Sequence, residues 1–130
     1  MELVLDKPEG YLFIRRQADD SITVVDRPIR HSFILARQQL QENWPITHAS
    51  QLNAELAAPI LALKPELVLL GTGPTQIFPS GDVLALFVDQ SIGVEVMSNA
   101  SAARTHGLLA AEGRQVVAAF ILAGPSSSGE

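Results

Sequence analysis

The hydrophobic positions of this chain fall into short runs separated by turn residues, and one run is central. Residues 67–70 are four consecutive apolar residues, bounded by Pro65 and Gly71. A strand with one face in water alternates apolar and polar residues, whereas a strand covered on both faces is continuously apolar. Four residues are too few for a buried helix, so the run predicts a central strand of a parallel sheet. The runs 92–97 and 115–122 predict two further buried strands.

The N-terminal third has a different pattern, typical of antiparallel strands. Residues 11–16 and 22–25 are rich in aromatic and β-branched side chains and are separated by a polar turn, which predicts a hairpin. Residues 29–36 predict a third strand. Pro28 cannot donate to a strand ladder, so it is expected at a boundary or a bulge.

Three helices are predicted between the buried strands. Thr47 or Ser50 caps the first, and Pro59 is expected to kink it. The second begins at Ser80, and the third follows a cap at Ser98. The apolar positions of the first helix recur every three or four residues: Leu52, Leu56, Ile60 and Leu63. In the third helix, Leu108 and Leu109 are expected to pack inward.

From residue 47 to residue 122 the pattern thus runs helix, strand, helix, strand, helix, strand. This alternation predicts an α/β fold with a mixed, mainly parallel central sheet, helices packed on it and an N-terminal antiparallel β-hairpin layer. How the N-terminal strands join the sheet is not readable from periodicity. We expect a single domain over 1–123, with the small polar residues 124–130 forming a disordered tail. Trp44 is expected as a partly buried anchor.

Composition narrows the class of protein. The 130 residues are 47% hydrophobic and 18% charged, which is enough apolar material for a sizeable core. The net charge of −5 and the lack of a basic stripe argue against nucleic acid. There is no cysteine, which excludes disulfides and thiolate sites. Neither a signal peptide nor a membrane span is recognisable, so we expect a cytoplasmic protein with no membrane insertion.

The turn Gly71-Thr72-Gly73 is the first candidate for a binding site, because open α/β sheets bind ligands at the carboxyl ends of their strands. It begins like a dinucleotide-binding loop. However, Gln76 stands where the third glycine belongs, and Pro74 removes an N–H group. A structural turn or a non-nucleotide pocket is therefore favoured over nucleotide binding.

Glu95 and Arg104 are the second candidate. Glu95 lies within a predicted buried strand, where an unpaired carboxylate is costly, and Arg104 on the next helix is its natural partner. Thr105 adds a hydroxyl, and His106 is expected on the helix surface nearby. Two interpretations stay open: a polar pocket beside Gly71–Gly73, or a structural ion pair between helix and sheet, which is favoured.

Other chemistry is not indicated. His31, His48 and His106 have no ligand-spaced partners, so no metal site is expected. No serine or threonine has an evident activating base, so we predict no catalytic residue and no cofactor. Arg15-Arg16 is interpreted as a solvated strand edge.

Several segments of the chain resemble a family of small domains of unknown function that includes the mitochondrial complex I assembly factor 3. The segments that carry the resemblance are 65–73, 93–97, Ala103-Arg104-Thr105 and 112–119. The resemblance implies an α/β domain whose last strand runs antiparallel to its neighbours. It also implies a binding role with a protein partner. Family members usually have Tyr-Asn where this chain has His106-Gly107.

Two hypotheses follow. The preferred one is a non-enzymatic interaction domain, resembling an assembly factor for a respiratory complex I-type or other membrane-associated complex. The alternative is a small-molecule or nucleotide-binding protein, or an enzyme, that uses Gly71–Gly73 with Glu95 and Arg104. Self-association through the N-terminal strand edges is compatible with the sequence, which does not decide it.

Overall fold

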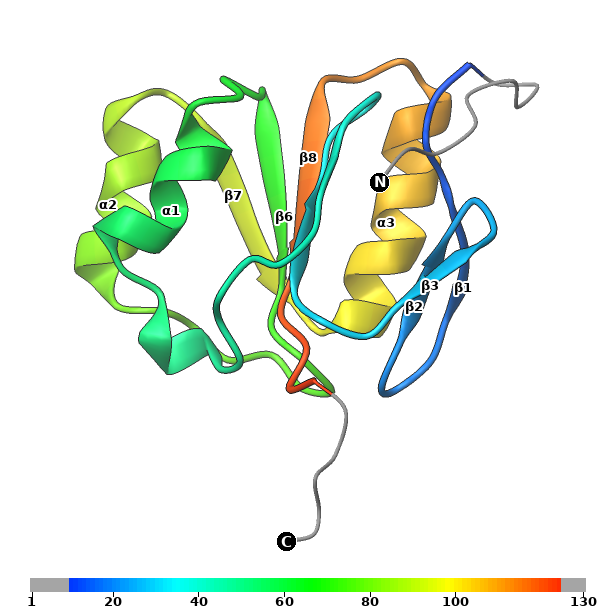
Figure 1. The fold of residues 1–130 in the computed structure, drawn as a ribbon. Helices are drawn as coiled ribbons and strands as arrows, with labels where there is room; N and C mark the ends of the chain where they lie inside the picture. The colour runs from blue at the N-terminus through cyan, green and yellow to red at the C-terminus, as the bar shows by residue number, and fades with distance from the viewer. Residues whose placement is uncertain (1–9, 125–130) are drawn as a thin grey trace, which may run out of the picture.

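The computed structural model describes residues 10–124 as two sheets and three α-helices (Figure 1). A small antiparallel sheet has the order β1-β2-β3, and the main sheet has the order β5-β4-β8-β6-β7. The small sheet comprises β1 (Ile14–Gln17), β2 (Ile22–Val24) and β3 (Arg27–Ile29). The main sheet comprises β4 (Phe33–Leu35), β5 (Leu40–Gln41), β6 (Leu67–Gly71), β7 (Gly93–Met97) and β8 (Val116–Phe120).

The main sheet is sandwiched between two different layers. The helices α1 (Ala54–Leu61) and α2 (Gly81–Asp89) cover one face, and α3 (Asn99–Ala111) covers the other face together with the small sheet (Figure 1). A short 3-10 helix, η1 (Ala49–Gln51), precedes α1. The predicted mixed α/β fold is therefore confirmed, and the N-terminal strands form a layer of their own.

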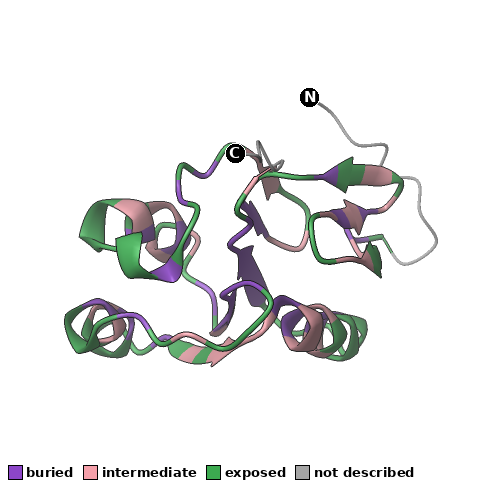
Figure 2. Cartoon of the chain, turned by 90° about the horizontal axis from the view of Figure 1, so that it is seen from below, coloured by how far each residue is buried: buried purple, intermediate pink, exposed green. Residues whose placement is uncertain are grey.

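The prediction that β6 is a central rather than an edge strand, covered on both faces, is confirmed, and β8 is the middle strand of the five. Val68, Leu69 and Leu70 are each at most 1% exposed, and β6 pairs in parallel with β7 on one side and β8 on the other. Figure 2 shows the buried strands β6 and β8 in the middle of the molecule, with the helices around them. Val68 and Leu70 point to the face covered by α1 and α2, and Leu69 points to the face covered by α3. Side-chain alternation along a strand thus supplies both cores from one apolar run.

The last strand, β8, lies between β4 and β6 and is buried throughout. It runs antiparallel to β4 but parallel to β6. The orientation implied by the family resemblance is therefore correct for β4 and wrong for β6. The reason is the crossover through α3, which returns the chain in the same direction as β6 and β7.

Strand β7 is an edge strand, which corrects the prediction of a buried strand at 92–97. Among the described strands it pairs only with β6. Gly93 and Glu95 are exposed, while Val94 and Val96 are half-buried. Its two valines are explained by packing on the α1 and α2 face, whereas Met97 at its end packs on the α3 face. The position of an edge is set by strand order, which a single run of residues does not encode.

The predicted third strand at 29–36 is in fact two strands in different sheets. Ile29 ends β3 of the small sheet, and Phe33 begins β4 of the main sheet. Between them Ser32 is buried and bonds to other segments instead of continuing a ladder. Pro28 lies inside β3 rather than at a boundary, which is tolerated because β3 is an edge.

The helices begin at side chains that cap them. Ser80 and Ser98 accept hydrogen bonds from Val83 N–H and Ser101 N–H, as predicted for α2 and α3. The first helix differs from its prediction, because His48 caps η1 and Asn53 caps α1 in place of Thr47 or Ser50. Pro59 lies within the last turn of α1, which ends two residues later.

Helix α3 buries a stripe of small and polar side chains, namely Asn99, Ala102, His106 and Ala110. Their spacing of three or four residues defines the face that packs on β6 and β8. The prediction that Leu108 packs inward is wrong, because its side chain is 69% exposed. The buried face of α3 was not recognised because it is formed by alanines, an asparagine and a histidine rather than by large apolar residues.

Trp44 is only 5% exposed, and its indole N–H donates to the carbonyl of Leu56 at 2.9 Å. It therefore ties the segment before η1 to α1, in agreement with its predicted anchoring role. The prediction of a disordered tail at 124–130 lies outside the described residues beyond Gly124.

Candidate functional site

The predicted turn at the end of β6 is held against the start of α3 by a buried asparagine. Asn99 accepts a hydrogen bond from Gly73 N–H at 3.2 Å and donates to the carbonyl of Ile121 at 3.0 Å. Its own N–H donates to the carbonyl of Gly73 at 2.8 Å. Asn99 therefore joins the carboxyl ends of β6 and β8 to the first turn of α3.

The two glycines of this turn are required for different reasons. A Cβ at Gly71 would clash with Asn99 Oδ1 and come within 3.0 Å of the Phe120 ring. Gly73 has a φ of 109°, a backbone conformation that side chains disfavour, although a Cβ there would meet no atom. Gly71 thus permits close packing of α3, whereas Gly73 permits the bend.

Thr72 organises the loop that follows. It is 4% exposed, its hydroxyl donates to the carbonyl of Thr75 at 2.7 Å, and it accepts from Ile77 N–H at 2.9 Å. Its backbone N–H donates to the carbonyl of Met97 at the end of β7. The hydroxyl is therefore used in shaping the loop.

A cavity of about 320 Å³ opens beside this turn, at the carboxyl ends of β6 and β8. Its polar lining includes Asp19 from the β1–β2 turn, Thr47 and His48 from the segment before η1, and Thr72 and Asn99. His48 Nδ1 accepts from Ser50 N–H at 3.1 Å, so in the neutral ring Nε2 holds the proton. The cavity lies where doubly wound sheets bind ligands, because α2 and α3 leave β6 and β7 toward opposite faces.

The expected pairing of Glu95 with Arg104 does not form in the structure. Both side chains are exposed, and Arg104 donates to Ser101 Oγ at 3.3 Å. The ion pairs found between residues 10 and 124 join other residues. Because β7 is an edge strand, the Glu95 carboxylate stays in water and needs no buried partner.

Thr105 is half-buried on α3, and His106 is buried rather than on the helix surface. Burial lowers the pKa of His106 to about 4, and its Nδ1 atom has no hydrogen-bond partner within the described part of the chain. The structure thus brings together Gly71, Thr72 and Gly73 of the predicted pocket. The cavity beside them includes none of Glu95, Arg104, Thr105 or His106.

The sequence reading missed Asn99, Asp19 and His48 at this cavity. Asn99 was detectable in principle, because it directly follows the helix-capping Ser98 at the end of a strand. Asp19 and His48 come from segments whose position depends on how the small sheet packs, which has no local sequence signal.

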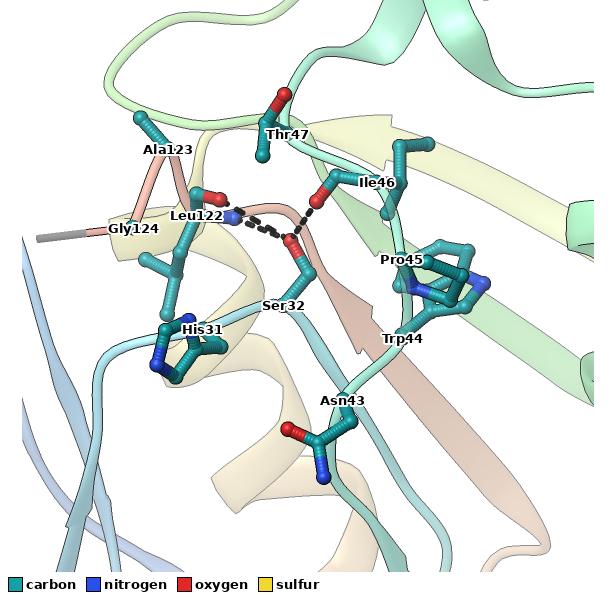
Figure 3. Close-up of a pocket in the computed structure, with 10 residues that line it drawn as sticks. All are labelled: His31, Ser32, Asn43, Trp44, Pro45, Ile46, Thr47, Leu122, Ala123 and Gly124. Atoms are coloured by element: carbon teal, nitrogen blue, oxygen red, sulfur yellow. Dashed lines mark hydrogen bonds between the residues drawn. The ribbon is translucent and has the colours of Figure 1, made fainter.

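A second and larger cavity, of about 430 Å³, lies between Trp44 and the segment after β8 (Figure 3). Ser32 stands at its centre, donating to the carbonyl of Ile46 at 2.6 Å and accepting from Leu122 N–H at 2.8 Å. These bonds satisfy the hydroxyl and tie three segments together. His31 is also part of the wall.

The side chains that line these two cavities do not form a set of metal ligands. Over residues 10–124, no group of three or more histidine, aspartate or glutamate side chains is placed to hold an ion. Within the same range no helix is long and apolar enough to cross a bilayer.

Comparison with known proteins places the fold and part of the sequence in a family. A Xanthomonas campestris protein solved by NMR is 39% identical, with a TM-score of 0.84 and 96% of each chain covered. A Bordetella pertussis protein, described as an Mth938-like domain, is 25% identical, with a TM-score of 0.79 and coverage of 98% of this chain and 96% of that one.

A Francisella tularensis subsp. holarctica protein named "13 kDa major membrane protein" is 26% identical over 117 residues, which is 89% of this chain and 95% of that protein. The profile of the family "Protein of unknown function (DUF498/DUF598)" matches residues 14–121. This match spans β1 to β8, so the chain belongs to the DUF498/DUF598 family.

Proposed function

We propose that this chain is a non-enzymatic interaction domain that helps to assemble or stabilise a membrane-associated complex, of the respiratory complex I type or another. Two similarities support the proposal: the resemblance to the family that includes the mitochondrial complex I assembly factor 3, and the Francisella relative named a major membrane protein. The observation on which it chiefly rests is the open edge at β7.

The outer strands of the two sheets differ in how far they are protected. β3 contains Pro28, β5 has only two residues, and α3 packs against β1. β7 has five residues, Gly93–Met97, with neither proline nor lysine, and lies at the margin of the sheet (Figure 2). Long edges without such protection are the ones to which a further strand can add.

The hydrogen-bonding groups on this edge can be assigned. Gly93 N–H donates to the carbonyl of Glu66 in the segment leading into β6, and the carbonyl of Met97 accepts from Thr72 N–H just after β6. In a parallel ladder alternate residues face the same neighbour, so Val94 and Val96 direct their backbone groups outward. The carbonyl of Val96 accepts from the Gln76 side chain at 2.9 Å. Val94 N–H, Val94 C=O and Val96 N–H are the groups that a partner strand would engage.

The side chains of β7 define what the partner strand should look like. Val94 and Val96 lie on the α1 and α2 face, whereas Glu95 is exposed on the opposite face. A partner strand with apolar residues on the first face and a lysine or arginine opposite Glu95 would be complementary. Two copies pairing with Glu95 opposite Glu95 would repel, so a different protein is favoured over self-pairing at this edge.

The test is affinity capture from the native organism with the wild-type chain and with Val94→Pro. Proline at this position removes an outward N–H and blocks strand addition, while the bonds to β6 come from neighbouring residues. We expect the wild-type chain to recover a reproducible partner that Val94→Pro loses. Because Val94 is half-buried against the α1 and α2 face, the variant should melt at a lower temperature, and its amide spectrum at the capture temperature verifies that it is folded. The control is Leu108→Ser, which changes a 69% exposed apolar side chain on α3, away from β7. Recovery of the same partner by Val94→Pro would refute a β7 interface.

A second candidate function is small-molecule binding in the 320 Å³ cavity beside Gly73, which is favoured by its place at the strand ends. A thermal-shift screen of nucleotides, sugars and organic acids tests it. A hit that is lost in His48→Gln but kept in His31→Gln would support the cavity, and the absence of any shift would remove its main support.

A further inference from the structure

The chain has a net charge of −5, yet three of its arginines line one surface groove of about 250 Å³. Arg15 and Arg16 come from β1, and Arg104 comes from α3, which packs against that strand. The other side chains that line the groove are uncharged: Ile14, Gln17, Ala100 and Ala103. A concentration of positive charge in an acidic protein is a local feature that overall composition does not explain.

An irregularity of β1 explains how two consecutive arginines reach the same groove. Ile14 pairs with Val24 and Arg16 pairs with Thr23, which are consecutive in β2, so Arg15 is an extra residue of β1 between the two pairs. In a regular strand neighbouring side chains point to opposite faces. A bulge breaks that alternation and redirects a side chain, and bulges are frequent beside functional sites.

In the part of the chain that the structure describes, the groove arginines have no carboxylate partner, in contrast to three other arginines. Among residues 10–124, ion pairs within 4 Å involve Arg27, Arg30 and Arg114. Arg15 instead donates to the carbonyl of Val25 and lies near the Phe13 ring, and Arg104 donates to the Ser101 hydroxyl. Neutral acceptors position these two guanidinium groups without cancelling their charge.

The groove has a defined end. Gln17 and Ala100 also line a smaller cavity at Gly73 and Asn99, where the Asp19 carboxylate stands. Asp19 would repel an anion, so an anionic group is confined to the arginine end. Ala100, which lines both cavities, belongs to the first turn of α3, whose partial positive charge also favours an anion.

We propose that Arg15, Arg16 and Arg104 bind the phosphate group of a small ligand or of a lipid headgroup. Guanidinium groups present parallel N–H donors that match phosphate oxygens. Three positive charges also suit a phosphate dianion better than the single negative charge of a carboxylate ligand. This inference concerns a surface of β1 and α3 and does not depend on the interaction proposed for β7.

The probe for the free ligand is pyrophosphate, titrated at low ionic strength and followed by calorimetry and by NMR of the arginine Nε–H groups. Arg16→Gln and Arg104→Gln should each weaken binding about tenfold, which corresponds to about 1.4 kcal/mol, because each removes a charge-assisted hydrogen bond to the phosphate. Arg30→Gln is the matched control, because it removes the same charge at another exposed site. Arg104→Lys keeps the positive charge but removes the planar, bidentate donor geometry of the guanidinium. It should therefore recover only part of the affinity that Arg104→Gln loses.

The lipid source is tested by sedimentation with phosphatidylglycerol vesicles and with phosphatidylcholine vesicles. Binding to pyrophosphate, to the anionic vesicles or to both supports the proposal if it is lost in Arg16→Gln and Arg104→Gln, and the pattern identifies the source. The proposal is overturned if neither probe binds, or if Arg30→Gln weakens binding as much as the groove variants. All variants alter exposed side chains, and their amide spectra verify the fold.

Discussion

The two faces of the main sheet are built from the same strands but differ in what they bury. The face under α1 and α2 is closed by aliphatic and aromatic side chains such as Ile60, Val83 and Phe87. The face under α3 and the small sheet also buries Asn99 and His106. The groove arginines lie at the margin of that second face. One face is therefore closed by apolar side chains, whereas the other combines its apolar core with polar groups that can respond to pH or bind a ligand.

The largest expected effect tests whether the α3 face is still a tight core. Phe120 stacks on Phe33 with ring centroids 5.2 Å apart, and both are fully buried. Phe120→Ala should lower the free energy of unfolding by about 4 kcal/mol, through lost burial and a residual cavity. Chemical denaturation measures it. A loss below about 1 kcal/mol would mean that this face is loosely packed and that the contrast between the faces is greater than described.

The next effect concerns pH and should be confined to the α3 face. The pKa of His106 is lowered from 6.5 to about 4 by burial, so between these values the unfolded state binds more protons than the folded state. Stability therefore rises with pH across this window, is complete above pH 6.5, and falls by about 3 kcal/mol as pH drops to 4.

The measurement is denaturation at a series of pH values in wild type, His106→Leu and the control His48→Gln. His106→Leu should flatten the profile between pH 4 and 6.5, whereas His48→Gln, at an exposed site, should leave it in place. An unchanged slope in His106→Leu would show that other groups produce the acid sensitivity.

Gly71 tests the contact between the candidate site and α3. Gly71→Ala should cost about 2 kcal/mol, because the new methyl group overpacks against Asn99 and Phe120. The amide signals of Gly73 and Asn99 should shift as α3 moves away. Equal stability of variant and wild type would mean that α3 can retreat freely, contrary to the close packing described.

The smallest effect belongs to the other face. Ile60→Val removes one buried methylene from the α1 side and should cost about 1 kcal/mol, with the same value at pH 5 and pH 8. A cost that changed with pH would indicate a titrating group on this side too, and the comparison between the faces would fail.

The parts predicted from sequence are those with local signals. The continuous apolar run made β6 recognisable as central, and serine caps located α2 and α3. The burial of His106 was missed because its helix face is otherwise formed by alanines and Asn99, so the two adjacent leucines drew the prediction to the wrong side. Strand order decided the rest: it made β7 an edge and left Glu95 in water.

Of the candidate site, the sequence indicated the glycine turn but not its surroundings. The cavity is completed by residues from the β1–β2 turn and from the segment before η1, which meet only through tertiary packing. Arg15-Arg16 was interpreted as a solvated strand edge and Arg104 as the partner of Glu95. The groove that they share was missed because the bulge at Arg15 depends on the pairing of β1 with β2.

The insertion of β8 between β4 and β6 has a consequence for how the chain is made. Until residues 116–120 have been synthesised, no strand joins β4 to β6. The nascent chain then exposes the unpaired backbone N–H and C=O groups of both strands, which promote aggregation. Closure of the domain is therefore a late event in synthesis. A premature stop ahead of Val116 should yield an aggregating fragment rather than a smaller folded one.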